Sequence, residues 1–574
     1  MEDIIRFNHF SFKYYSQAEP TLYDIQLNIK KGEKILIVGP SGSGKSTLAN
    51  CINGLIPFVY KGDIQGSVEI DGLCIGNGNG KQARSLFDVS KKVGTVLQDP
   101  DGQFVGLNVA EDIAFALEND NTPLKEMKER VEKIAQIVDM QNFLSNNPYE
   151  LSGGQKQRVS LAGVMVDDVD ILLFDEPLAN LDPKTGKVAI ELIDDLHKDG
   201  KTIIIVEHRL EDVLHRHVDR IVVIEEGHIV QVGTPDEVLS SDVLQKCGIR
   251  EPLYCTACKY ANVKLTPEMH PESLDSLNMD AVSSSLHNWY DQVKPKEETQ
   301  NQKVVMKIDN LSFSYDGIKP ILSHVSADIY QGEMVSIIGK NGAGKSTLSK
   351  CIVGFENQDE GTITIENLDL SKLSIKERAD HVGIVLQNPN QMISKTMIYD
   401  EIALGLKIRG VSEEEIEKRV THIMKICGLA PFKKWPISAL SFGQKKRVTI
   451  ASILVLNPKV LILDEPTAGQ DYYHYSEIMN FLKELNEQGQ TIVLITHDMH
   501  LMLEYTPRAI VLCNGEKIAD QKAYEILCNE QICEKANLKE TSLFTLAKKA
   551  EIEDPVQFVE KFIQFEKERK AYEN

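Results

Sequence analysis

The sequence has no uninterrupted apolar run long enough to cross a bilayer, and its first residues are acidic rather than the basic start of a signal peptide. We therefore expect a cytoplasmic protein that does not itself span a membrane. Basic residues are also scarce, because 63 Lys and Arg stand against 85 Asp and Glu, for a net charge of −22. This balance argues against binding to nucleic acid or to anionic lipid. Any membrane attachment should go through a protein partner, without direct lipid insertion.

Cysteine patterns typical of metal sites are missing as well. The ten cysteines are scattered, and Cys255 and Cys258 form a lone CxxC without a second pair or a histidine at zinc-finger spacing. In a cytosolic chain we expect free thiols and, at this pair, two partly buried thiols in a helix.

What the sequence does have is a phosphate-binding pattern, G-x-x-x-x-G-K-[ST], in two places. Each copy lies between an apolar strand-like run, at residues 35–38 or 335–338, and a helix-like run. Glycines let backbone N–H groups close around phosphate oxygens, and the helix N-terminus adds positive potential. The lysine, Lys45 or Lys345, reaches the β- and γ-phosphates, and the hydroxyl of Ser46 or Ser346 ligates Mg²⁺. We therefore predict two sites for a nucleoside triphosphate.

The predicted nucleotide-binding residues are Gly39, Pro40, Ser41, Gly42, Ser43, Gly44, Lys45, Ser46 and Thr47 in the first loop, and Gly339, Lys340, Asn341, Gly342, Ala343, Gly344, Lys345, Ser346 and Thr347 in the second.

Further blocks recur in the same order after each loop, which indicates one domain written twice. Strand-like runs alternate with helical periodicity in each copy, and this alternation favours an α/β domain with a largely parallel sheet. We predict a first domain at residues 1–245, a partly helical linker at 246–303, a second domain at 304–545 and a helical C-terminal extension at 546–574.

Two carboxylates end an apolar run in each copy, Asp175 and Glu176 in the first and Asp464 and Glu465 in the second. Sheets of α/β domains bind ligands at the carboxyl ends of their strands. The first acid suits coordination, through water, of the Mg²⁺ that the loop serine holds. The second can accept a proton from a water aimed at the γ-phosphate. Alone, the pair could be a helix N-cap or an exposed strand end, but its place after both phosphate loops favours catalysis.

A histidine, His208 or His497, follows the next apolar run of each copy. A single histidine at a strand end is usually structural, but the repeated position favours a sensor of the γ-phosphate that holds the attacking water. Gln98 and Gln387 end short apolar strands before Pro-containing segments, where they can touch both Mg²⁺ and water.

In the first copy a serine and two glycines also open a helical run, and together they form an anion site at a helix N-terminus. One domain then contains two anion sites, which either lie close together or serve different nucleotides, each signature serving the other copy's triphosphate. The signature residues are Ser152, Gly153, Gly154 and Gln155 in the first copy, and Ser441, Phe442, Gly443 and Gln444 in the second.

Phosphate loop, glutamine, LSGGQ signature, Asp–Glu pair and histidine, in this order, resemble the ATP-binding cassette (ABC) ATPases. The resemblance implies P-loop NTPase domains with a helical signature subdomain, joined head to tail in a sandwich. Each of two ATPs would lie between one copy's phosphate loop and the other's signature. It also implies that Tyr14 and Tyr315 stack on adenine, and that Asp182 and Asp471 couple the sites across the interface.

A finer resemblance lies after the first glutamine. Residues 98–106 and 109–115, together with the fused pair of cassettes, look like the energy-coupling-factor importers of vitamins and metal ions. This resemblance implies an ATP- and Mg²⁺-dependent subunit on the cytoplasmic face of the cell membrane. Its partners would be a transmembrane coupling component and a substrate-binding membrane component. Some members of this group serve uptake of thiamine precursors, but the ATPase need not touch the substrate.

Apolar residues after the two glutamines either form a groove for a partner's helices or belong to the core. They are Phe104, Val105, Val109, Ile113 and Phe115 in the first copy, and Met392, Ile393, Met397 and Ile398 in the second.

Two other functions need weighing. Soluble translation factors of the ABC-F type also have two cassettes, but they resemble each other in a long, charged helical hairpin between them. Here the intervening stretch contains several prolines and Trp289, and the acidic charge disfavours RNA. A DNA-repair ATPase would need zinc-binding cysteine clusters, which the sequence lacks.

One departure from the repeat concerns Phe442, which stands where the first copy has Gly153. Phenylalanine reaches positive φ only at a cost, and its bulk limits close approach to phosphate. We expect the Lys45 site, which would borrow Phe442, to close less readily and to hydrolyse ATP more slowly than the Lys345 site.

Overall fold

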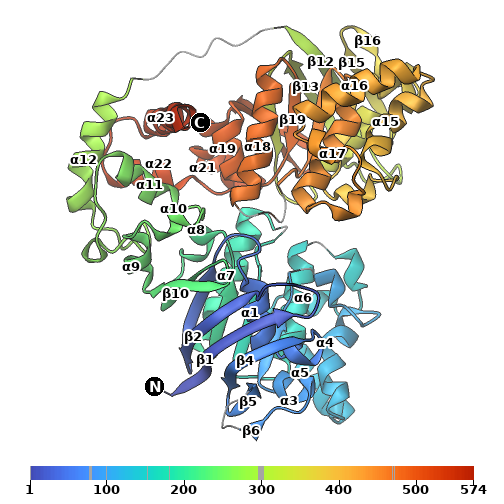
Figure 1. Ribbon diagram of the computed structural model, residues 1–574. Coiled ribbons are helices and arrows are strands. Elements are labelled where there is room, and N and C mark those ends of the chain that lie inside the picture. Colours follow the sequence, from blue (N-terminus) through green and yellow to red (C-terminus); the bar gives the residue numbers. More distant parts are fainter. Residues whose placement is uncertain are drawn as a thin grey trace. The chain divides into compact units, whose positions relative to one another are not determined.

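The computed structural model describes residues 2–76, 81–98, 100–151, 153–179, 181–294, 303–467, 470 and 472–573. The chain divides into two compact units (Figure 1). Unit 1 comprises Met1–Gln292, Asp471–Tyr473 and Thr545–Ile552, and unit 2 comprises Val293–Gln470, His474–Phe544 and Glu553–Asn574.

Unit 1 contains two sheets, in the orders β2-β1-β4-β5-β6 and β11-β10-β3-β9-β8-β7. In the second sheet, β7, β8, β9, β3 and β10 run parallel, and β11 is antiparallel at the edge. The strands are β1 (Asp3–Tyr14), β2 (Leu22–Lys30), β3 (Lys34–Val38), β4 (Gly62–Ile70), β5 (Leu73–Gly76), β6 (Lys81–Gln82), β7 (Val93–Val96), β8 (Ile171–Asp175), β9 (Thr202–Val206), β10 (Arg220–Glu225) and β11 (His228–Gly233).

The helices of this part of the chain are α1 (Lys45–Ile52), α2 (Leu55–Phe58), α3 (Leu86–Ser90), α4 (Val109–Asn119), α5 (Leu124–Ile137), α6 (Gly153–Met165), α7 (Pro183–Lys198), α8 (Leu210–Val213), α9 (Pro235–Leu239), α10 (Val243–Lys246), α11 (Leu253–Tyr260) and α12 (Met279–Gln292).

Unit 2 repeats this architecture with sheets in the orders β13-β12-β15-β16 and β17-β18-β19-β14-β20-β21. Its strands are β12 (Val304–Phe313), β13 (Leu322–Tyr330), β14 (Met334–Ile338), β15 (Glu360–Ile365), β16 (Leu368–Asp369), β17 (Val382–Val385), β18 (Val460–Asp464), β19 (Thr491–Ile495), β20 (Arg508–Cys513) and β21 (Glu516–Lys522). The prediction of one α/β domain written twice is confirmed.

The helices of the second half are α13 (Lys345–Val353), α14 (Ile375–Arg378), α15 (Ile398–Ile408), α16 (Glu413–Ile426), α17 (Phe442–Leu454), α18 (Tyr472–Glu487), α19 (Met499–Tyr505), α20 (Ala523–Leu527), α21 (Glu530–Ala536), α22 (Ser542–Lys549) and α23 (Pro555–Glu573).

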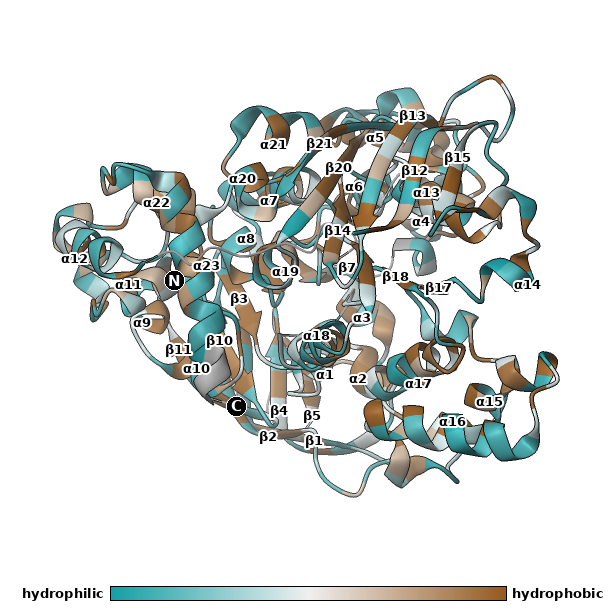
Figure 2. Cartoon of the chain, turned by 90° about the horizontal axis from the view of Figure 1, so that it is seen from above, coloured by the Kyte–Doolittle hydropathy of each residue, from teal (hydrophilic) through white to brown (hydrophobic). Residues whose placement is uncertain are grey.

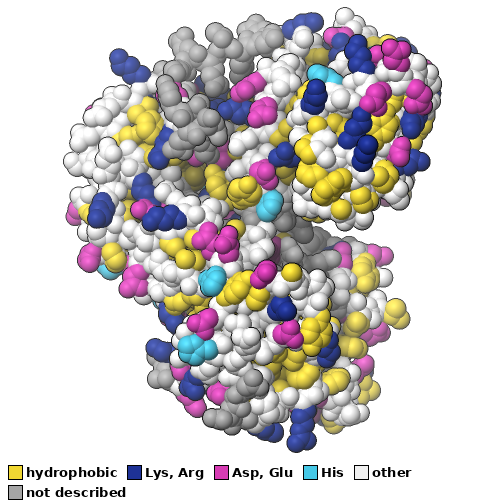
Figure 3. Space-filling view, in the orientation of Figure 1, with side chains coloured by type: hydrophobic (Ala, Val, Ile, Leu, Met, Phe, Trp, Pro, Cys, Tyr) yellow, Lys and Arg dark blue, Asp and Glu magenta, His cyan; other side chains and the backbone are white. Residues whose placement is uncertain are grey.

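The central strands explain their own sequences. Every residue of β3, β9, β14 and β19 is buried, because a parallel strand is covered on both faces, and such strands read as continuous apolar runs. Figure 2 shows that β3, β14 and β20 are largely apolar, whereas α16 is mostly hydrophilic. On the face that Figure 3 displays, acidic, basic and apolar side chains are interspersed.

A helical subdomain of α4, α5 and α6 has a hydrophobic cluster of its own in unit 1. Phe104 is buried in it, and Val109 and Ile113 of α4 are fully buried in it. Ile398, at the start of α15 in unit 2, is also fully buried. Of the two alternatives for these four residues, the core holds and the open groove does not, because their side chains pack inward. Val105 and Phe115, in contrast, are 60% and 46% exposed.

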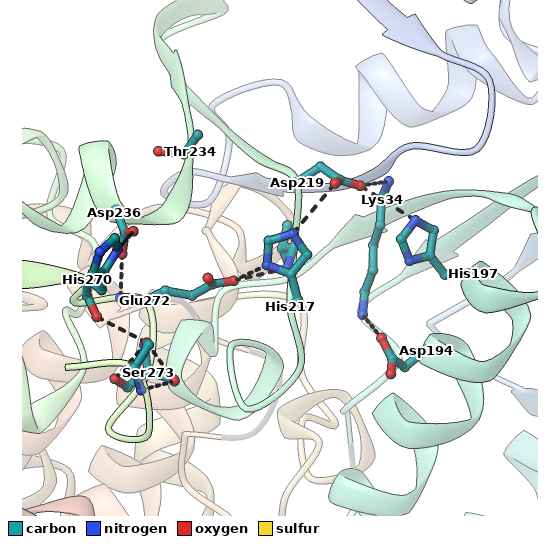
Figure 4. Close-up of polar contacts among 12 residues, drawn as sticks. Lys34, Asp194, His197, His217, Asp219, Thr234, Asp236, His270, Glu272 and Ser273 are labelled. Carbon is teal, nitrogen blue, oxygen red and sulfur yellow. Dashed lines mark hydrogen bonds and ion pairs between the residues drawn. The ribbon is translucent and has the colours of Figure 1, made fainter. Parts of the chain in front are cut away.

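Residues 246–292, which follow the first copy, are part of unit 1. Cys255 and Cys258 are buried free thiols of α11, as expected, and all ten cysteines are free. Figure 4 shows the polar contacts that hold the turn before α12: His217 lies 2.8 Å from Glu272, and His270 lies 3.1 Å from Asp236. Residues up to Gln292 thus belong to unit 1 by their contacts.

Candidate nucleotide-binding sites

The two phosphate loops follow β3 and β14 and lead into α1 and α13. Gly44 and Gly344 have φ of 102° and 97°, in the left-handed region that favours glycine. A Cβ at Gly39 would lie 2.2 Å from the carbonyl oxygen of Ile224 in β10, so a side chain cannot fit there. These close approaches fix the path of each loop and explain its glycines.

The two loop lysines are buried and bound to their own loops. Lys45 Nζ donates to the carbonyl oxygens of Gly39 (2.8 Å) and Pro40 (2.9 Å). Lys345 Nζ donates in the same way to Gly339 (2.8 Å) and Lys340 (3.0 Å). Each ammonium is therefore held inside its loop, close to a helix N-terminus, in an arrangement that suits an anionic ligand.

The Asp–Glu pairs lie at the carboxyl ends of β8 and β18, as predicted. Glu176 and Glu465 both have positive φ, 48° and 45°, which is uncommon for glutamate. Their backbone N–H groups donate to Val206 (2.8 Å) and Ile495 (2.9 Å), the last residues of the neighbouring strands β9 and β19. Strained backbone of this kind persists where the surrounding structure imposes it, and it is concentrated at functional sites.

The structure brings the predicted glutamine, glutamate and histidine of the first copy together. The Gln98 side-chain amide donates to the Glu176 carboxylate, and His208 Nδ1 lies 4.0 Å from Glu176 Oε1. In the second copy the contact differs, because His497 Nδ1 lies 2.8 Å from Glu465 Oε1. The Gln387 side chain is exposed.

Burial and mutual repulsion perturb the carboxylates of both copies. Burial raises the pKa of Glu176 to about 7, and the negative charges of Glu207 and Asp175 add to this effect. The positive charges of Lys45 and Arg209 oppose it. Burial also raises the pKa of Asp175.

In the second copy burial, followed by the charge of Glu465, raises the pKa of Asp464, while a hydrogen bond with Ser346 opposes the shift. Clustered carboxylates beside a hydroxyl fit a divalent cation, whose charge would stabilise their ionised forms.

The predicted adenine-stacking tyrosines are placed differently in the two copies. Tyr14 Oη lies 3.2 Å from Thr47 Oγ1 of the phosphate-loop helix, and its ring packs edge-on against Phe12. Tyr315 is exposed and packs edge-on against Phe313. Stacking of these two tyrosines on adenine stays a prediction.

The signature and coupling residues make local helix caps. Ser441 forms a capping box with Gln444 at the start of α17, where its hydroxyl accepts from the Gln444 N–H at 3.2 Å. Asp182 caps α7 and accepts from the Thr185 N–H at 2.9 Å. Ser152 and Asp471 lie outside the described residues.

Phe442 does not have the left-handed backbone that was expected to separate the two signatures. Phe442 is the first residue of α17, and it is not among the residues with positive φ. Gly153 is the first residue of α6. A helical backbone needs no glycine, so the expected cost of a left-handed conformation is absent. What distinguishes the two copies here is the phenylalanine side chain itself, which is 45% exposed.

Two charged residues beside the sites were not predicted. Lys446 of α17 is 1% exposed and donates to the carbonyl oxygens of Leu386 (2.9 Å) and Gln387 (2.7 Å). Burial lowers its pKa to about 8, against the charges of Asp464 and Glu465. The second residue, Glu207, is buried before His208. Lys446 corresponds to Gln157 in the first copy, and Glu207 corresponds to Thr496 in the second. These two differences between the copies are the signal in the sequence that could have revealed both residues.

Comparison with known proteins adds independent information. A family described as "ABC transporter" matches residues 22–179 and 322–468, and a family described as "ATP-binding cassette cobalt transporter" matches residues 241–313. An ABC transporter ATP-binding protein of Clostridium perfringens is 57% identical over 567 residues, which are 98% of each chain. One of Enterococcus faecalis is 57% identical over 568 residues, covering 98% of this chain and 99% of that protein.

Among solved structures, cbiO1 from Clostridium perfringens, described as part of the ABC transporter complex cbiONQ, is 35% identical. The alignment covers 41% of this chain and 95% of that chain, with a TM-score of 0.38.

Proposed function

The chain belongs to the ABC transporter ATP-binding proteins, a family of ATPases, and from this membership we propose that it is the energy-coupling subunit of an importer of the energy-coupling-factor type. The observation that supports the finer assignment is the match of residues 241–313 to a family described as a cobalt transporter. Among a vitamin, a vitamin precursor and a metal ion, this match favours a metal ion such as cobalt as the cargo.

In the proposed reaction the chain's own residues bind ATP and activate water. Lys45 and Lys345 turn from their loop carbonyls to the β- and γ-phosphates. Glu176 and Glu465 accept the proton of the attacking water, and His208 and His497 hold that water in line.

Mg²⁺, when bound, neutralises charge that develops on the phosphates. The residues that would hold it are the loop hydroxyls, the side chains of the two glutamines and, through water, the two aspartates: Ser46, Gln98 and Asp175 in the first copy, and Ser346, Gln387 and Asp464 in the second.

We further propose that two ATPs are enclosed between the copies, each between one phosphate loop and the other copy's signature. Ser441 supports this arrangement, because its cap leaves the N-terminus of α17 with further backbone N–H groups able to meet a phosphate. ATP binding then closes the pair and hydrolysis opens it, which moves the membrane partner. Asp182 and Asp471 would couple the two sites.

The alternative of an ABC-F translation factor lacks support. Between the cassettes, residues 246–292 form short helices such as α11 and α12, which belong to unit 1. ABC-F factors instead need a long hairpin that reaches the ribosome. We propose membrane components as the partners, a transmembrane coupling component and a substrate-binding component, with no nucleic acid bound. No helix in the described part of the chain is long and apolar enough to cross a bilayer.

The partner's docking site is proposed near Val105 and Phe115, the exposed members of the predicted groove. A charge at Val105 would oppose packing of an apolar helix without entering the core. Val105→Glu should therefore release the chain from membranes and leave its basal ATPase activity within about twofold, since changes at exposed positions alter stability little. Val230→Glu, at a half-exposed position on β11, is the matched control and should stay bound.

The test is affinity purification of the full chain from detergent-solubilised membranes, followed by identification of the integral membrane proteins that accompany it. Addition of cobalt ions to the captured complex should stimulate its ATPase activity. Recovery with ribosomes instead of membrane proteins would refute the transport assignment, and release of the Val230→Glu control would refute the docking site.

A further inference from the structure

A buried carboxylate stands directly before the histidine of the first site. Glu207 follows β9 and is 1% exposed, although an ionised side chain is rarely buried unless it is fully hydrogen-bonded. Neither the binding of ATP nor the proposed attack of water uses this group. A buried charge that the chemistry does not need calls for another role.

Both carboxylate oxygens of Glu207 are engaged by backbone N–H groups. Oε1 accepts from His208 (2.8 Å) and from Arg209 (3.3 Å), and Oε2 accepts from Leu178 (3.2 Å). Leu178 lies two residues beyond Glu176, so one side chain ties the segment after the proposed base to the segment that carries the histidine. Hydrogen bonds to an ionised acceptor are stronger than neutral ones, so this link is stiff.

In the second site, other residues hold the segment around the histidine. Thr496 stands where the first copy has Glu207, and its hydroxyl accepts from the Asp498 N–H (2.9 Å), within its own segment. Asp498, after the histidine, accepts from the N–H groups of His500 (2.8 Å) and Leu501 (3.1 Å) and caps α19. The carboxylate has therefore moved from one side of the histidine to the other between the two copies.

We propose that Glu207 is a positioning residue of the first ATP site, which sets the geometry of His208 relative to Glu176 by holding the two backbone segments together. The proposal rests on the proposed roles of Glu176 and His208 in hydrolysis. Small displacements of reacting groups cost large factors in rate. Loss of Glu207 leaves three N–H groups without their acceptor, so the two segments separate or rearrange.

The test uses the full chain with Glu465→Gln, so that turnover comes from the first site. Adding Glu207→Thr, the residue of the second copy, should lower kcat about tenfold and leave the KM for ATP within about twofold, because orientation is lost while the phosphate loop is intact. Where the Glu465→Gln chain hydrolyses no ATP, the two sites act only together. The same loss is then expected from Glu207→Thr in the otherwise unchanged chain.

A rescue separates positioning from simple loss of stability. The double change Glu207→Thr and Arg209→Asp gives His208 the same two neighbours that His497 has in the second copy. The kcat of this chain should be at least about threefold higher than that of the Glu207→Thr chain. The matched control is Glu251→Gln, which alters another buried glutamate of unit 1, on a segment without site residues. It should leave kcat within about twofold.

Unchanged kcat in the Glu207→Thr chain overturns the inference, and so does an equal loss in the Glu251→Gln control. If Arg209→Asp restores the melting temperature of the Glu207→Thr chain but not its kcat, the result also counts against a positioning role. Failure of the proposed function looks different: normal hydrolysis by a chain with both Glu176→Gln and Glu465→Gln would remove the roles on which the inference rests, whatever Glu207 does.

Discussion

The two proposed catalytic centres have the same backbone conformation at their glutamates and differ in the charges around them. In each copy the glutamate has positive φ and donates its N–H to the end of the next strand. In the second copy His497 lies 2.8 Å from Glu465, whereas in the first His208 is 4.0 Å from Glu176 and Gln98 makes the contact.

The buried charges differ between the two centres as well. The first centre contains the extra carboxylate of Glu207, whose charge helps to raise the pKa of Glu176 to about 7. The second contains the ammonium of Lys446, which faces the charges of Asp464 and Glu465. The duplicated domain has therefore kept its chain path, which glycines and strained turns enforce, while the electrostatic surroundings of the two proposed bases differ.

The strongest way to test this comparison is to remove both bases. Glutamine keeps the shape of glutamate but cannot take a proton, so the chain with Glu176→Gln and Glu465→Gln should lose more than about a hundredfold in turnover. It should still bind ATP and trap a closed state. Phosphate release and nucleotide retention measure the two effects. Near-normal hydrolysis with Mg²⁺ present would show that neither glutamate is the base.

The pH dependence of the first site should be the next largest effect. A base with a pKa of about 7 is protonated below that pH. In the Glu465→Gln chain, kcat/KM should therefore fall as the pH decreases through 7, by up to about tenfold per unit. Glu207→Gln removes a negative charge and should move the midpoint to lower pH. A profile that is flat between pH 6 and 8, or a midpoint that Glu207→Gln leaves in place, would contradict this assignment.

Lys446 offers a test of the second centre. Lys446→Gln introduces the residue of the first copy, where Gln157 donates to the Pro177 carbonyl instead. Without the ammonium, the carbonyls of Leu386 and Gln387 lose their donor, and we expect kcat to fall about fivefold through misplacement of the glutamine segment. The measurement is steady-state ATPase activity of the Glu176→Gln chain.

The reciprocal change Gln157→Lys is the matched control for the first copy. An equal loss from both changes, or none from either, would mean that this difference between the copies has no effect on turnover.

The sequence predicted the fold well because its signals are local and repeated. The phosphate loops and the strand-end acids recur in order, and buried parallel strands read as apolar runs. It could not predict the positive φ of Glu176 and Glu465, since that conformation comes from the packing of neighbouring strands rather than from the residue type. It left open whether Val109 and Ile113 line a groove or belong to the core, because apolar periodicity does not show which face of a helix meets its neighbours.

The sequence also did not predict the two buried charged residues, Lys446 and Glu207. A lysine in a signature helix suggests an exposed side chain, and only tertiary packing shows that Lys446 is buried and bound to carbonyl groups. The domain boundaries, the roles of the site residues and the sandwich between the copies stay predictions.

The smallest expected effect concerns Phe442, because the cost of a left-handed backbone that was expected to slow the Lys45 site is absent. Since the backbone of Phe442 is helical, Phe442→Gly releases no strain, and a glycine at the start of a helix costs about 1 kcal/mol or less. Only the exposed aromatic ring can hinder approach of a phosphate to the N-terminus of α17. We therefore expect Phe442→Gly to raise turnover at the Lys45 site by no more than about threefold, which corresponds to less than 1 kcal/mol.

Gly153→Phe is the matched change in the first copy, and it should slow the Lys345 site by a similar factor, because it adds the same ring at the first residue of α6. Lys345→Ala should then reduce overall turnover more than Lys45→Ala, with Phe442→Gly narrowing the gap. Equal losses from the two lysine changes, together with silent Phe442→Gly and Gly153→Phe, would show that the signature position does not distinguish the sites. Any asymmetry between the copies would then have to come from the buried charges of Glu207 and Lys446, which act on the bases themselves rather than on the closing of the site.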